Sequence, residues 1–116
     1  MSTERQAEVL PNLSPAHALL SAADQHPDRV SLIDAESART FTLAQSAGCV
    51  RRLAWYFTTL GLSAGDRIVV CAPNSVWHFL IHAAASWIHA VSVPISPLLP
   101  EAVRTRLYDE VAPALI

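Results

Sequence analysis

The chain has 116 residues, enough for one small domain, and 52% of them are hydrophobic while only 16% are charged. Its net charge of −2 includes no run of like charge, which argues against electrostatic binding to nucleic acid or to acidic membranes. Average proteins are about 25% charged. The low charged fraction predicts either a large core or apolar surface that expects a partner, which is the remainder of a larger protein or a second copy.

The first predicted elements are a leader and a helix. Residues 1–12 are polar and end in Pro11-Asn12, and we expect them to be a disordered leader. Ser14 and Pro15 are typical of a helix start, with serine as the cap and proline at the first helical position. The helix should end before Pro27, because a residue preceding proline disfavours the helical backbone.

A small hairpin and a long helix follow. Val30–Asp34 is predicted to be a strand, and Arg39–Phe41 can return beside it. Thr42 should cap the long helix, with Gln45 three residues later completing a capping box. Apolar residues then recur with a period of about 3.6. Gly61 should end this helix, since glycine adopts the left-handed cap conformation at little cost.

The second half alternates strands and helices. The predicted order is strand Ile68–Ala72, helix Val76–Ala90, strand Val91–Ile95, helix Glu101–Val111 and the start of a strand at Pro113–Ile116. The first of these strands is apolar on both faces, which is typical of the middle of a parallel sheet covered by helices. The first helix is apolar nearly all round and should be mostly buried. We therefore predict an α/β fold, a partial three-layer sandwich whose parallel βαβαβ core follows a small helix and a β-hairpin.

Histidine and cysteine offer the most obvious metal ligands. His78, His82 and His89 fall within about 40° of one another if the helix runs through all three at roughly 100° per residue. Two histidines at this spacing can bind zinc. No acidic residue or cysteine shares their face, so a solvent-facing or interface-facing stripe is the preferred interpretation. Cys49 and Cys71 are predicted to be buried thiols, because they lack the close spacing of a metal site.

The sequence gives little support for a catalytic nucleophile or for a nucleotide-binding loop. Ser75 follows a strand and opens a helix, but it lacks the flanking glycines of a nucleophile elbow, so it should be a helix cap. The three glycines form no phosphate-binding fingerprint, and the chain contains no lysine. Trp55, Tyr56, Trp77 and Trp87 occupy helical positions and are predicted to be packing residues. We assign no catalytic, cofactor-binding or metal-binding residue.

Several short motifs together resemble one enzyme family. In order and spacing they are similar to the N-terminal segment of AMP-forming acyl-CoA synthetases, the fatty-acid–CoA ligases of the adenylate-forming AMP-dependent synthetase/ligase superfamily. The resemblance runs from about Leu13 to Ile116, and implies that residues 13–116 are part of the N-terminal subdomain of an AMP-binding synthetase domain. The motifs are His26–Val30, Leu32–Asp34, Phe41–Leu43, Arg52–Ala54, Gly61–Leu62 with Gly65–Val70, Pro73–Ser75, Val93–Pro97 and Pro100–Glu101.

The resemblance implies a two-step ligase reaction. A carboxylic acid attacks ATP to give an acyl-adenylate and pyrophosphate, and a thiol, usually coenzyme A, then takes the acyl group. ATP, magnesium and coenzyme A are implied for the full-length family, but no position here matches the residues that hold them. We therefore expect the isolated chain to be inactive. The family usually has Ala-Gly before the strand at 91, whereas this chain has His89-Ala90.

Three other interpretations remain open. The chain could be a free-standing interaction module, the N-terminal part of another adenylate-forming enzyme such as a peptide-synthetase adenylation domain, or a small enzyme with a histidine metal site. The sequence contains no apolar signal segment, and prolines and histidines interrupt its most apolar stretch, 76–100. A cytoplasmic protein without a transmembrane segment is the expectation.

Overall fold

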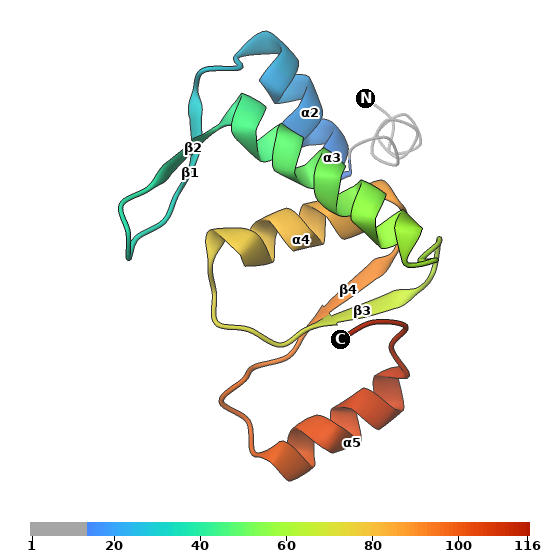
Figure 1. Ribbon diagram of the computed structural model, residues 1–116. Helices are drawn as coiled ribbons and strands as arrows, with labels where there is room; N and C mark the ends of the chain where they lie inside the picture. The colour runs from blue at the N-terminus through green and yellow to red at the C-terminus, as the bar shows by residue number, and fades with distance from the viewer. Residues whose placement is uncertain (1–13) are drawn as a thin grey trace, which may run out of the picture.

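The computed structural model describes residues 14–116, so the predicted leader at 1–12 lies outside the described residues. Figure 1 shows a layered α/β arrangement, in which one group of helices lies on one side of a parallel strand pair and the last helix on the other. The elements are α2 (Pro15–Gln25), β1 (Val30–Ile33), β2 (Thr40–Thr42), α3 (Leu43–Thr59), β3 (Arg67–Val70), α4 (Val76–Trp87), β4 (Val91–Pro94) and α5 (Glu101–Val111).

The predicted N-terminal helix and hairpin are confirmed. Ser14 caps α2, and its hydroxyl oxygen accepts a hydrogen bond from the backbone N–H of His17 at 3.2 Å. Strands β1 and β2 pair antiparallel, with an irregularity in register between Val30 and Leu32. The hairpin is tied to α3 by a hydroxyl pair, because Ser31 Oγ lies 2.7 Å from Oγ of the fully buried Ser46. This pair satisfies the polar group of Ser46 inside the apolar core.

Helix α3 begins with the predicted capping box. The backbone N–H of Gln45 donates to Thr42 Oγ1 at 3.1 Å, and the backbone N–H of Thr42 donates to Gln45 Oε1 at 2.9 Å. Two backbone donors that the helix cannot satisfy itself therefore each find a side-chain acceptor.

We expect Thr42→Ala and Gln45→Ala each to lower the free energy of unfolding by about 1 kcal/mol, because each change leaves one of these donors without its side-chain partner. Urea denaturation followed by circular dichroism measures the loss. Thr59→Ala is the matched control, since its exposed hydroxyl only donates to the carbonyl of Tyr56. Equal stability of Thr42→Ala and Thr59→Ala would contradict the assigned role of the box.

Helices α3 and α4 end in the same backbone motif. At the end of α3, the N–H of Leu62 donates to the carbonyl of Phe57 at 3.1 Å, and Gly61 has a φ of +85°. At the end of α4, the N–H of Ala90 donates to the carbonyl of Ala85 at 2.9 Å, and His89 has a φ of +59°. Both ends are Schellman motifs. The first places glycine at the left-handed position, as predicted, and the second places a histidine there.

The parallel sheet is centred on β3. Strand β4 pairs with β3 from Arg67 opposite Val91 to Val70 opposite Pro94. On the other edge of β3, Leu115 forms a single parallel bridge with Ile68, and the N–H of Val69 donates to the carbonyl of Leu115 at 2.8 Å. The predicted third strand is thus confirmed in place and direction but limited to one bridge. Pro113 contributes no backbone donor there, and the segment pairs only with β3.

Helix α4 is less buried than its sequence predicted. Leu80 and Ala83–Ala85 are fully buried against the remaining core, whereas the side chains of Trp77 and Phe79 are partly exposed. The helix also ends at Trp87, so the prediction of a helix through Ala90 was wrong. An apolar pattern on all sides of a helix indicates that every face could be buried. The number of neighbouring elements decides how many faces are buried in the fold. Within residues 14–116, α4 packs mainly against α2, α3 and β4, and the hairpin reaches only its start, where the rings of Phe41 and Trp77 meet edge to face.

Candidate functional site

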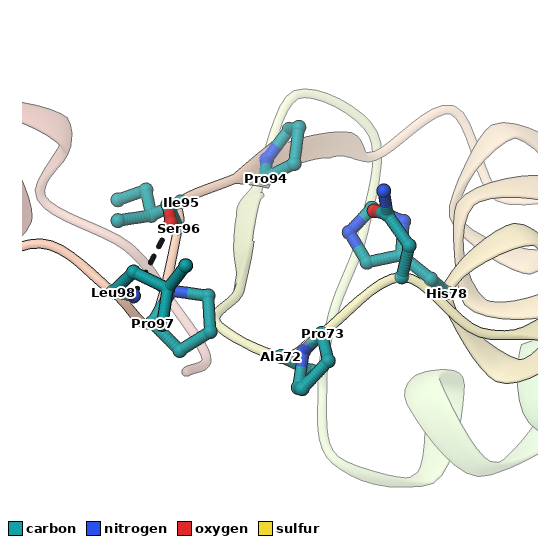
Figure 2. Close-up of a pocket in the computed structure, with 9 residues that line it drawn as sticks. Ala72, Pro73, His78, Pro94, Ile95, Ser96, Pro97 and Leu98 are labelled. Atoms are coloured by element: carbon teal, nitrogen blue, oxygen red, sulfur yellow. Dashed lines mark hydrogen bonds between the residues drawn. The ribbon is translucent and has the colours of Figure 1, made fainter.

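The carboxyl ends of β3 and β4 border a pocket in the described part of the chain. The residues following β3, Ala72–Asn74, and those at the end of β4 and beyond, Pro94–Leu98, line a hollow of about 580 Å³. Figure 2 shows His78, from the first turn of α4, on one side of this hollow and Ile95–Leu98 on the opposite side. The pocket therefore lies between the two loops that follow the parallel strands β3 and β4.

The connections of the two strands explain why this pocket exists. From β3 the chain passes to α4 on one face of the sheet, and from β4 it passes to α5 on the opposite face (Figure 1). The two loops diverge, and a crevice opens between them outside the carboxyl ends of the strands. Open α/β sheets bind their ligands at such switch points. The position makes this pocket the candidate binding site of the chain.

The lining of the pocket limits what it can hold. Its polar side chains are those of Asn74, His78 and Ser96, and the rest of the lining is alanine, proline, isoleucine and leucine. Ser96 Oγ already accepts a hydrogen bond from the backbone N–H of Leu98 at 3.2 Å, shown as the dashed line in Figure 2. The lining contains no arginine, lysine or carboxylate, so it does not fit a nucleotide triphosphate with its magnesium ion. It suits an apolar or weakly polar group.

These residues were not predicted to form a site. Pro73–Ser75 was predicted to be a turn and 97–100 a rigid loop, each by itself. The available signal was their shared position after neighbouring parallel strands, because the carboxyl ends of such strands meet at one edge of a sheet. That the two loops diverge and leave a hollow between them could be seen only in the tertiary structure.

The three histidines have separate environments. His78 lines the pocket, and His82 Nδ1 is paired with the hydroxyl of Ser92 on β4. His89 lies beyond the end of α4 in the left-handed conformation, so the predicted stripe of three histidines on one helix face was wrong for His89. Among residues 14–116, no group of three or more histidine, cysteine, aspartate or glutamate side chains is arranged to hold a metal ion.

Ser75 is a helix cap, as predicted. Its φ of −158° is ordinary extended backbone, and its hydroxyl accepts a hydrogen bond from the N–H of His78 at 3.4 Å. A nucleophile elbow would require a strained turn at this position. The hydroxyl of Ser75 therefore serves the start of α4.

Cys49 and Cys71 are both free thiols, and both are half-buried instead of fully buried as predicted. Cys71 follows β3 and contacts Tyr108 on α5. A hydrogen bond with the Cys71 side chain, together with desolvation, raises the pKa of the Tyr108 phenol above its usual value, while the charge of Arg104 acts in the opposite direction. The phenol of Tyr108 therefore stays protonated at neutral pH.

The aromatic residues of α3 are more exposed than predicted. The side chain of Trp55 is 72% exposed and that of Tyr56 is 56% exposed. The prediction that they are packing residues was wrong for these two, because the buried face of α3 is formed by Ser46, Ala47, Val50, Ala54 and Phe57.

Comparison with known proteins decides the family. The model of the family described as AMP-binding enzyme matches residues 19–116, nearly all of the described chain. The chain belongs to the AMP-binding enzyme family. The resemblance noted in the sequence is therefore confirmed, and the βαβ core with its preceding helix and hairpin is the N-terminal part of this family's fold.

Curated relatives of this AMP-binding family member are 4-coumarate–CoA ligases. The chain is 35% identical over 89 residues to 4-coumarate–CoA ligase 2 of Oryza sativa subsp. japonica, covering 76% of this chain and 16% of that protein. It is 32% identical over 75 residues to 4-coumarate–CoA ligase 1 of Petroselinum crispum, covering 65% of this chain and 14% of that protein. The chain thus spans about one sixth of the length of the first of these relatives.

Solved structures share the fold. A fatty acyl-CoA synthetase of Mycobacterium tuberculosis superposes with a TM-score of 0.81 at 25% identity, over 86% of this chain and 20% of that one. The N-terminal domain of FACL13 from the same organism superposes with a TM-score of 0.83 at 24% identity, over 88% of this chain and 26% of that one.

No helix within residues 14–116 is both long and apolar enough to span a bilayer.

Proposed function

We propose that this AMP-binding family member is the N-terminal structural part of an ATP-dependent acyl-CoA ligase. In the proposed reaction, a carboxylate attacks ATP and releases pyrophosphate, and the thiol of coenzyme A then displaces AMP from the acyl-adenylate. The observation that supports this most strongly is the 35% identity over 89 residues to a 4-coumarate–CoA ligase. The proposed location is the cytoplasm, where ATP and coenzyme A are available.

The chain's own part in this function is structural. The buried strand β3 holds the sheet together, and the loops that follow β3 and β4 shape a pocket without charged groups. ATP and magnesium need a triphosphate cradle and acidic ligands, which residues 14–116 do not assemble. We propose that the remainder of the synthetase supplies these groups and docks on exposed apolar side chains beside the pocket, such as Leu98.

The isolated chain is expected to release no pyrophosphate above background when mixed with ATP, magnesium, coenzyme A and either 4-coumarate or fatty acids. The physical reason is the lack of any phosphate-binding or metal-binding constellation among the described residues. A coupled pyrophosphate assay measures this, with the Oryza sativa ligase as positive control. Turnover by the isolated chain would show that it carries an active site of its own.

A complementation experiment tests the positive side of the proposal. The 116-residue chain is co-expressed with a 4-coumarate–CoA ligase that lacks the matched N-terminal segment, and formation of 4-coumaroyl-CoA is measured. Rescue of the truncated ligase supports the structural role. Binding to the intact ligase without rescue of the truncated one would instead support a free-standing interaction module. Formation of an adenylate without acyl-CoA would favour another adenylate-forming enzyme.

A further inference from the structure

Helix α3 exposes large aromatic side chains beside arginines. Trp55 and Tyr56 project from its outer side, and Arg51 and Arg52, one turn earlier, are also exposed. Residues four positions apart lie on the same side of a helix. Arg51 therefore lies beside Trp55, and Arg52 lies beside Tyr56.

The exposed surface extends from α3 onto α4. Arg51, Trp55 and Trp87 line one hollow of about 270 Å³ between the two helices. The side chain of Trp87 is 39% exposed, and its ring stacks on the ring of His17 with centroids 5.3 Å apart. We call the surface formed by Arg51, Arg52, Trp55, Tyr56 and Trp87 the aromatic–arginine face.

Charge is unevenly distributed along the sequence. The segment 37–65, which includes all of α3, contains three arginines and no acidic residue. The other residues contain five arginines and all ten acidic residues. The net charge of the whole chain is −2, which argued against binding to acidic membranes, but helix α3 by itself is positively charged. An electrostatic interaction depends on this local charge because salt screens charges more than about 10 Å away.

We propose that the aromatic–arginine face binds the surface of an anionic lipid bilayer. Tryptophan and tyrosine prefer the headgroup region, where an apolar ring meets water, and arginine pairs with lipid phosphates. Because Arg51 lines the hollow between α3 and α4 together with Trp55, that hollow is not the purely apolar groove that recognises a peptide helix. The face lies on the surface of the bilayer and does not span it.

Vesicle co-sedimentation of the 116-residue chain tests this proposal. We expect binding to vesicles of phosphatidylcholine with about 30% phosphatidylglycerol, weak binding to pure phosphatidylcholine, and loss of binding in about 0.5 M NaCl, because two arginines attract anionic lipid and salt screens them. Tryptophan emission should shift to shorter wavelength on binding. Equal binding to both kinds of vesicle would overturn the proposal.

Two variants and one control assign the binding to this face. Arg51→Gln/Arg52→Gln should weaken binding to anionic vesicles by about 25-fold, since each arginine near the membrane contributes about fivefold. Trp55→Ser should weaken it at least fivefold without unfolding the protein, because the side chain is 72% exposed. Ile33→Ser removes another exposed apolar side chain, 65% exposed, outside the face and should bind as the parent does.

The alternative occupants give different results. If a second copy covers the face, Trp55→Ser abolishes a concentration-dependent dimer in sedimentation equilibrium and leaves vesicle binding unchanged, which overturns the proposal. If Ile33→Ser weakens binding as much as Trp55→Ser, the binding belongs to exposed apolar surface in general, which also overturns it. None of these outcomes depends on the ligase activity proposed above.

Discussion

Replacing Leu80 with alanine is expected to lower the free energy of unfolding by about 2–5 kcal/mol. Leu80 is the largest side chain that is fully buried, and it lies in α4 between the helices and the parallel sheet. Its neighbours on the buried face, Ala83–Ala85, are already small, so no long side chain can move into the space it leaves. A domain of this size has a total stability of about 5–15 kcal/mol, so a substantial part of it would be lost.

Urea denaturation followed by circular dichroism measures this effect as a fall of the midpoint by about 1 M or more, given slopes of about 1–3 kcal/mol per molar urea. Leu98→Ala is the matched control, because the same truncation at a side chain that is 93% exposed should change stability by less than about 0.5 kcal/mol. If the two variants had equal midpoints, the assignment of Leu80 to the centre of the core would be incorrect.

Replacing His89 with glycine is expected to raise the free energy of unfolding by about 0.5–1 kcal/mol. His89 has a φ of +59°, a left-handed conformation that costs a residue with a Cβ atom about 1–2 kcal/mol and costs glycine almost nothing. Part of the gain is offset, because glycine also makes the unfolded chain more flexible. The imidazole of His89 is exposed, so its removal empties no cavity.

The equivalent position of α3 provides the reciprocal experiment. Gly61→Ala should lower the free energy of unfolding by about 1 kcal/mol. An added Cβ would meet no atom within 4 Å there, so the loss would come from the φ of +85° alone. Ala90→Gly is the second control, because Ala90 has no positive φ and glycine should not stabilise it. Thermal unfolding of the three variants checks the order, and a stabilising Ala90→Gly with a neutral His89→Gly would contradict it.

Helix boundaries were well predicted wherever a side chain makes the cap. Ser14, Thr42 and Ser75 each start a helix as expected, since a capping hydroxyl acts on backbone groups two or three residues away. The end of α4 was not predicted. The left-handed residue there is a histidine instead of the expected glycine. The local bonds of the Schellman motif are joined by a tertiary one, from the N–H of Gly65 to the carbonyl of His89 at 2.9 Å, which the sequence pattern does not reveal.

The candidate site was predicted much less well than the fold. No residue of the pocket was singled out for binding, although His78 was considered as a metal ligand. Its lining combines two loops separated by about twenty residues, and their spacing depends on α4 and α5 leaving the sheet on opposite faces. Local sequence patterns report turns and strands, but they do not report the face on which a connection crosses.

The sequence by itself determined the family, the order of the elements and the central place of β3. Hydrophobic periodicity and capping act over a few residues, so both can be read without a structure. The tertiary structure alone decided which apolar side chains are covered. Trp55 and Leu80 are both large apolar residues on helices, yet one is 72% exposed and the other fully buried. Burial depends on which neighbouring elements reach a given side chain, and this information is distributed over the whole fold.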